Sequence, residues 1–152
     1  TTLSEGRGTG RPFQLIGAPY VDADALADAM SAKQLPGLRI APTHFTPTSR
    51  KFANELCHGV FLEPADPRAV RPVSIGLHLI AELIRLHPQK FEWLPIAEVN
   101  GKRSLQHFDR LVGQSDVRAW LMDQSGDLPD RITAATQAGS WKSRGRSHFL
   151  YV

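Results

Sequence analysis

One long apolar helix constrains the fold of this chain more than any other part of its sequence. Asp66-Pro67 is a typical helix start, and His87-Pro88 ends the pattern. Apolar residues recur between them at helical spacing and also occupy the other faces: Val73, Leu77, Ile80 and Ile84, with Ile75, Leu79 and Leu83. A helix that is apolar on several faces must be covered on several sides, so we expect it to pack against a sheet.

The residues before this helix favour three short strands. Phe13 to Ile16 and Gly59 to Leu62 are apolar runs bounded by proline and glycine. A third strand begins with the alternating residues Leu38 to Ala41 and continues to Thr46 despite Pro42, which indicates a sheet edge or a bend.

Three further helices are indicated by capping residues and apolar spacing. Asp22 or Asp24 is a suitable N-cap for a helix that stops before Pro36-Gly37. Later in the chain, Ser115 to Gln124 and Pro129 to about Arg144 both have helical patterns.

The remaining segment, Gln89 to Arg103, has no regular period, and we expect Phe91, Trp93 and Leu94 to hold it against the core. Together the elements predict a single α+β domain, with a small mixed sheet of about three to four strands packed against four to five helices. The length of 152 residues fits one domain, and 41% hydrophobic with 22% charged residues excludes a disordered or fibrous chain. No apolar run is long enough to span a membrane.

Metal, redox and nucleic-acid functions find little support. The six histidines form no pair at a zinc-ligand spacing, so we predict no metal site and no cofactor. The single cysteine, Cys57, excludes an intramolecular disulfide and is interpreted as a small buried residue. A formal net charge of +3 is too small for a nucleic-acid arm, and the basic run Lys142, Arg144 and Arg146 is interpreted as the solvated end of a helix.

The segment from Leu3 to Phe13 has the composition of either a loose tail or a binding site. It carries three glycines, two arginines, a carboxylate and two hydroxyls, with almost nothing apolar to bury. No Gly-Lys-Ser/Thr follows, and no strand precedes it, so a nucleotide loop is disfavoured. Composition alone favours a mobile tail, with Glu5 paired to Arg7 rather than catalytic.

A second polar cluster runs from His44 to Phe52, where a strand gives way to a loop. Hydroxyls, cations and two aromatic residues gather there, as they do in ligand-binding loops on rigid scaffolds. The alternative is an ordinary polar loop with Phe45 and Phe52 in the core, and the chemistry alone favours that alternative.

The sequence resembles the C-terminal part of the NamZ family of exo-β-N-acetylmuramidases, glycoside hydrolase family 171, formerly a domain of unknown function. The resemblance begins with Leu3-Ser4-Glu5-Gly6-Arg7-Gly8-Thr9 and extends in order to the closing Phe149-Leu150-Tyr151. The motifs between are Arg11-Pro12-Phe13, Ile16-Gly17-Ala18-Pro19-Tyr20, Leu35-Pro36-Gly37-Leu38, Phe45-Thr46-Pro47-Thr48, Lys51-Phe52, Glu55-Leu56-Cys57, Gly59-Val60, Arg71-Pro72-Val73, Phe91-Glu92-Trp93 and Phe108-Asp109-Arg110-Leu111-Val112-Gly113.

This resemblance implies that residues 1–152 form the C-terminal auxiliary domain of a longer enzyme that removes terminal N-acetylmuramic acid from peptidoglycan fragments. A Rossmann-like N-terminal domain, which carries the main catalytic glutamate and lies outside this chain, would be its partner. Residues 1–12 would be the interdomain and active-site segment. The resemblance further implies Glu5 as an assisting carboxylate and five substrate-binding residues: Arg7, Thr9, Arg11, Thr46 and Thr48.

Some residues depart from the family pattern, namely Gly10, Tyr20, His58 and the segment Leu62 to Asp66, which leaves the fine substrate preference open. The alternative function is a non-catalytic module that binds glycan or packs on a neighbouring domain. The chain starts at Thr1-Thr2, directly before the motif, which indicates a cut inside a longer protein and leaves the compartment undetermined.

Overall fold

The computed structural model describes residues 1–95, 98–99, 102–103, 107–124, 126–137 and 139. They form a single α+β domain, as predicted. A three-stranded sheet has the order β1 (Leu15–Ala18), β3 (Cys57–Pro64), β2 (Leu38–Phe45), and the helix α1 (Ala23–Ser31) lies between β1 and β2 in sequence. Both strand pairs are antiparallel, where the sequence suggested a mixed sheet.

The central strand β3 is held closely against β1 by a pair of glycines. Gly17 of β1 faces Gly59 of β3, and a Cβ on either residue would collide with the backbone of the opposite strand. Ser4 extends this edge, because its N–H donates to the carbonyl of Gly17 at 2.8 Å and its own carbonyl accepts from Gly17 N–H at 3.1 Å. The N-terminal segment is therefore attached to the free edge of β1.

The strand β1 starts two residues later than predicted. Phe13 has a φ of 67° and is 61% exposed, so it lies outside the strand and outside the core. A left-handed backbone at this residue is incompatible with an extended strand.

The helix α1 is confirmed, with Asp22 as its N-cap. The Asp22 carboxylate accepts from the backbone N–H of Ala25 at 3.0 Å, which satisfies one of the free donors of the first turn. Leu26, Ala27 and Met30 are buried on its inner face.

The long helix α2 (Pro72–Leu86) is buried on several sides, as predicted, but it begins six residues after Asp66 rather than at Asp66-Pro67. Asp66 instead closes a turn by accepting from the N–H of Arg68 at 3.0 Å. A helix that began at Pro67 would place Pro72 in its interior, where proline lacks the N–H and clashes with the preceding turn. Pro72 is acceptable only in the first turn, so the helix starts there.

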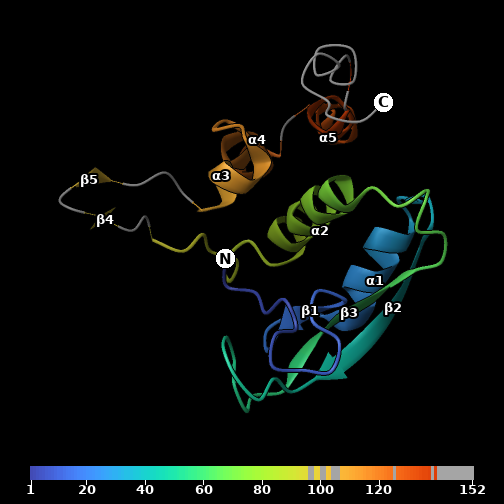
Figure 1. Ribbon diagram of the computed structural model, residues 1–152, viewed down its shortest axis with the longest axis vertical. Helices are drawn as coiled ribbons and strands as arrows, with labels where there is room; N and C mark the ends of the chain where they lie inside the picture. The colour runs from blue at the N-terminus through green and yellow to red at the C-terminus, as the bar shows by residue number, and fades with distance from the viewer. Residues whose placement is uncertain (96–97, 100–101, 104–106, 125, 138, 140–152) are drawn as a thin grey trace, which may run out of the picture.

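The principal neighbours of α2 are helices rather than the sheet. Figure 1 shows α2 with α1 on one side and, on the other, α4 (Val117–Asp123) and α5 (Leu128–Thr136), and it contacts all three. The side-chain amide of Gln124, at the end of α4, donates to the carbonyl of Ala81 at 2.8 Å. The core formed around α2 includes Leu77, Leu83, Val117, Leu121 and Ile132.

The segment after α2 is more regular than expected. A two-stranded hairpin, β4 (Glu98–Val99) and β5 (Lys102–Arg103), lies where the sequence suggested an irregular segment, and the short helix α3 (His107–Val112) was not predicted. The last helix ends at Thr136, before the predicted limit near Arg144, which lies outside the described residues together with Lys142 and Arg146. Among the described helices, none has the length and hydropathy needed to cross a membrane.

Candidate functional site

The glycine-rich N-terminal segment is anchored to the domain rather than loose. Leu3 and Ser4 are buried, and Ser4 pairs with β1. Thr2 is bonded to the segment that follows α2, because its N–H donates to the Glu92 carbonyl at 3.0 Å and its hydroxyl to the Lys90 carbonyl at 3.0 Å. Tyr20 adds a hydrogen bond from its hydroxyl to the Thr2 carbonyl at 2.9 Å.

Two glycines with left-handed backbones turn the segment after Glu5. Gly6 has a φ of 72° and Gly8 a φ of 85°. A Cβ on Gly8 would lie 2.7 Å from the backbone N and O of Ser49, so only glycine fits at this approach of the two loops.

The predicted substrate ligands Thr9 and Thr48 make hydrogen bonds within these loops. Thr9 donates from its hydroxyl to the Gly6 carbonyl at 2.6 Å, and that hydroxyl accepts from Arg11 N–H at 3.2 Å. Thr48 donates from both its N–H and its hydroxyl to the Gly8 carbonyl, at 2.8 and 2.9 Å. Both threonines therefore fix the loop that carries Arg7.

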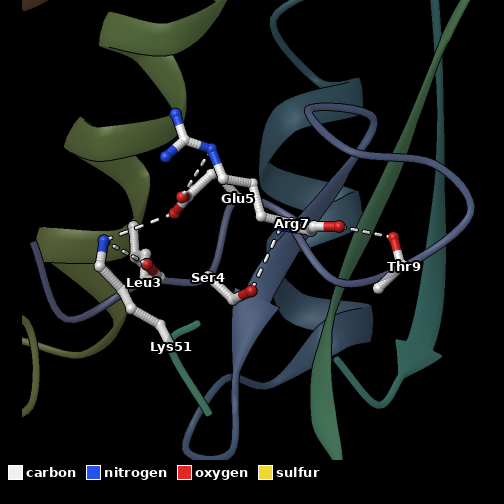
Figure 2. Close-up of polar contacts among 7 residues, drawn as sticks. Leu3, Ser4, Glu5, Arg7, Thr9 and Lys51 are labelled. Atoms are coloured by element: carbon white, nitrogen blue, oxygen red, sulfur yellow. Dashed lines mark hydrogen bonds and ion pairs between the residues drawn. The ribbon is translucent and has the colours of Figure 1, made fainter. Parts of the chain in front are cut away.

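The Glu5 carboxylate lies between two cations that come from different loops. Figure 2 shows it between Arg7 and Lys51, with Arg7 Nε 3.4 Å from Oε1 and Lys51 Nζ 3.4 Å from Oε2. Lys51 Nζ also donates to the Leu3 carbonyl at 3.0 Å. The side chain of Glu5 is 29% exposed and that of Arg7 is 53% exposed, so a ligand can reach this cluster. The group of three carries one net positive charge.

Lys51 is the site residue that the sequence reasoning missed. Its neighbours Arg50 and Phe52 both have left-handed backbones, with φ of 71° and 58°, and Asn54 follows with 65°. In this turned backbone the side chain of Lys51 extends toward the N-terminal segment, where its Nζ contacts Leu3 and Glu5. The cluster of cations and hydroxyls between His44 and Phe52 was the available signal, but its pairing with Glu5 depends on the fold.

The Glu5 cluster forms one wall of a hollow of about 430 Å³. That volume is within the range of roughly 300–1,000 Å³ that is typical of small-molecule sites. The charged wall consists of Glu5, Arg7 and Lys51, and the apolar remainder comes from several elements: Phe13, Ile80, Trp93, Leu94, Phe108 and Leu111. Thr1 and His107 complete the rim.

Two further predicted residues lie away from this hollow. The guanidinium of Arg11 stacks 5.1 Å from the ring centroid of Phe61, on the sheet. Thr46 follows the end of β2 and is exposed. Arg7, by contrast, lies beside the hollow with its guanidinium 5.4 Å from the ring centroid of Phe13.

Two other titratable residues, Cys57 and His78, are buried and do not line the hollow. Burial raises the pKa of the Cys57 thiol to about 11, which disfavours the nucleophilic thiolate. Burial also lowers the pKa of His78, which lies inside α2 as expected for a core histidine. Within the described part of the chain, no group of three or more His, Cys, Asp or Glu residues is placed to hold a metal ion.

Comparison with known proteins gives three consistent similarities. The family described as "Exo-beta-N-acetylmuramidase NamZ, C-terminal" matches residues 1–151. The chain is 38% identical over 118 residues to the peptidoglycan β-N-acetylmuramidase NamZ of Bacillus subtilis (strain 168). The aligned region covers 78% of this chain and 26% of that protein. The chain thus spans about a quarter of the length of this curated relative.

The fold also matches a solved structure, that of a DUF1343 family protein from Bacteroides fragilis NCTC 9343. The TM-score is 0.76 with 22% sequence identity, and the match covers 99% of this chain and 38% of the other. At this identity the likeness concerns the fold alone.

Proposed function

The chain belongs to the C-terminal family of the exo-β-N-acetylmuramidase NamZ, and from this premise we propose that it is the auxiliary domain of a peptidoglycan-degrading glycoside hydrolase. The longer enzyme would remove terminal N-acetylmuramic acid from muropeptides or glycan fragments. Its N-terminal domain would carry the main catalytic glutamate, and the hollow beside Glu5 would form part of the glycan cleft.

The observation that carries this proposal is the paired cations beside the hollow. Muramic acid differs from glucosamine by a lactyl ether that ends in a carboxylate. Arg7 and Lys51 both face Glu5 with their cationic groups at 3.4 Å, which leaves one positive charge in excess. Charge-assisted hydrogen bonds from such groups to a carboxylate are among the stronger polar contacts, so the cluster suits an anionic sugar.

Glu5 has two parts in the proposal. It holds Arg7 and Lys51 in place in the free domain, and it assists the chemistry once the glycan is bound. Glycoside hydrolysis commonly uses two carboxyl groups, one to protonate the leaving oxygen and one to activate water or attack the sugar. A substrate carboxylate bound by Arg7 or Lys51 would compete with Glu5 for that cation, which would couple binding to the chemistry.

The other predicted ligands have different positions in this proposal. Thr9 and Thr48 shape the loop that presents Arg7, since their hydroxyls are bonded to the carbonyls of Gly6 and Gly8. Arg11 and Thr46 lie outside the walls of the hollow, so they would contact glycan that extends beyond it.

Hydrolysis by the longer enzyme and by the 152-residue chain tests the proposal. We expect the longer enzyme to release N-acetylmuramic acid from a chromogenic muramic acid glycoside and the isolated chain to show no turnover, because half of the cleft lies in the other domain. Robust turnover by the isolated chain would contradict the auxiliary role.

A non-catalytic module remains the second candidate, and one observation favours it. Both carboxylate oxygens of Glu5 are within 3.4 Å of a cation, as in a purely structural ion pair. The two functions are separated by titrating muramic acid fragments into Glu5 and Arg7 variants of the longer enzyme. A catalytic role predicts that Glu5→Gln lowers turnover more than affinity, whereas a binding module predicts loss of affinity alone.

A further inference from the structure

An aromatic wall, formed by Trp93 and Phe108, lines the same hollow as the Glu5 cluster. Trp93 and Phe108 both line the hollow, and their rings pack together with centroids 4.8 Å apart at an angle of 52°. The two residues come from separate segments, one following α2 and one in α3. The tertiary fold therefore forms one aromatic surface from two segments that are not adjacent in the sequence.

An ion pair between Asp109, which is buried, and Arg118 contacts this wall. Asp109 is bound at both carboxylate oxygens by Arg118, with Nε to Oδ1 at 2.6 Å and Nη2 to Oδ2 at 2.8 Å. The same guanidinium lies over the Trp93 ring, 5.8 Å from its centroid. Arg118 thus fixes Asp109 of α3 and the Trp93 ring together, as a positioning residue for both.

The indole nitrogen of Trp93 is a buried donor without an acceptor among the described residues. A buried donor left unpaired costs about 1–3 kcal/mol, so such groups are rare in folded proteins. Trp93 nevertheless lines the hollow, so an oxygen of a molecule bound there is a candidate acceptor.

We propose that Trp93 and Phe108 form a sugar-stacking subsite that takes the carbon-rich face of an N-acetylated pyranose ring. This inference rests on the proposed function, and it assigns a role to the aromatic residues of the hollow, which the charged residues leave unexplained. The C–H groups of a pyranose pack on aromatic faces, while Arg7 and Lys51, which line the same hollow, would bind the lactyl carboxylate. One wall thus recognises the ring, and the other recognises the acid.

Two monosaccharides separate the contributions of the walls. N-Acetylmuramic acid carries the lactyl carboxylate, and N-acetylglucosamine presents the same acetylated ring without it. Binding of each is measured by saturation-transfer NMR and calorimetry, in the 152-residue chain and in the longer enzyme. The variants are Trp93→Leu, Phe108→Leu and Lys51→Met, with Trp120→Leu as a control for loss of a half-buried tryptophan outside this hollow.

We expect Trp93→Leu and Phe108→Leu each to weaken the binding of both sugars by about tenfold, which is the scale of one aromatic contact. Lys51→Met should weaken the binding of N-acetylmuramic acid only, and Trp120→Leu should change the binding of neither sugar. Melting curves show whether each variant is folded, and the half-buried Phe108 serves as the test should Trp93→Leu unfold.

The two proposals fail in different ways. Wild-type affinity for both sugars in the folded aromatic variants, with Lys51→Met still weakening N-acetylmuramic acid, overturns the stacking subsite and leaves the proposed function standing. Absence of binding of both sugars to the wild-type chain and to the longer enzyme contradicts both proposals.

Discussion

The ammonium of Lys51 lies 3.4 Å from Oε2 of Glu5, a residue 46 positions earlier in the chain. This pairing joins the glycine-rich segment to the loop after β2 and gives the hollow its charged wall. Lys51 Nζ also donates to the Leu3 carbonyl, so the lysine contacts both a side chain of the N-terminal segment, that of Glu5, and the backbone of that segment.

Lys51→Met should reduce the preference of the longer enzyme for muramic acid over glucosamine termini. The methionine keeps the length and apolar stem of the side chain but removes the charge that would meet the lactyl carboxylate. We expect KM for a muramic acid glycoside to rise by about tenfold, equivalent to one charge-assisted hydrogen bond of roughly 1.4 kcal/mol. An unchanged KM would remove Lys51 from the proposed site.

Glu5→Gln should lower kcat/KM strongly in the longer enzyme with little change in melting temperature. Its ion pairs are partly exposed, and such pairs contribute only about 0–1 kcal/mol to stability. The matched control is Glu63→Gln, which removes an exposed pair with Arg39 on the sheet, away from the hollow. Equal activity of the two variants would make Glu5 a structural residue.

Gly8→Ala should destabilise the domain and displace Arg7, whereas Gly10→Ala should do neither. An added Cβ on Gly8 meets the Ser49 backbone at 2.7 Å and needs a φ of 85°, while a Cβ on Gly10 meets nothing within 4 Å. We expect a loss of about 2 kcal/mol for Gly8→Ala, which thermal unfolding would register as a shift of roughly 4–8 °C. Identical melting curves for the two variants would show that the loop adjusts freely.

Asp109 should make the stability of the domain fall in acid. The hydrogen bonds from Arg118 hold the pKa of Asp109 below its ordinary value. The folded state therefore binds a proton less readily than the unfolded chain, and the resulting stability is present above about pH 4 and is lost as the pH falls through the folded pKa.

Asp109→Asn should remove this pH-dependent contribution and cost about 2 kcal/mol near neutral pH, because a hydrogen-bonded charge is replaced by a neutral group. Asp116→Asn is the control, since Asp116 is exposed and its side chain makes no capping bond. Urea unfolding between pH 3 and 7 measures both variants. A steep acid loss that survives in Asp109→Asn would place its origin elsewhere, for example at Glu82, which Lys33 and Arg85 hold at 2.7 Å.

Local chemistry was enough to predict α1 and most of the sheet. The Asp22 cap and the buried residues of α1 follow from capping and helical spacing, which act within a few residues. The predicted start of α2 was wrong because Asp66-Pro67 was given more weight than Pro72. Proline is tolerated in the first turn of a helix but not in its interior, so Pro72 excludes a helix that begins at Pro67. The hairpin of β4 and β5 and the helix α3 are short, and a few residues carry too little periodicity to reveal them.

The candidate site was predicted only in part, for a different reason. Glu5 and Arg7 are two residues apart, so their pairing could be expected from sequence. Lys51 reaches Glu5, and Trp93 reaches Phe108, only through the tertiary fold, and no spacing rule connects them. Thr9 and Thr48 matched a family motif, yet their hydroxyls are bonded to nearby carbonyls, which depends on the left-handed turns of Gly6 and Gly8.

The hydrogen bonds of Thr2 and Ser4 have a mechanical consequence. Thr2 is tied to the segment after α2, and Ser4 to the edge of the sheet, within the first four residues. The start of the described chain therefore has a fixed position between the edge of the sheet and the segment after α2. A force applied at Thr1 would therefore reach the sheet and the segment after α2 directly, and the first four residues could move away from the domain only by breaking these bonds.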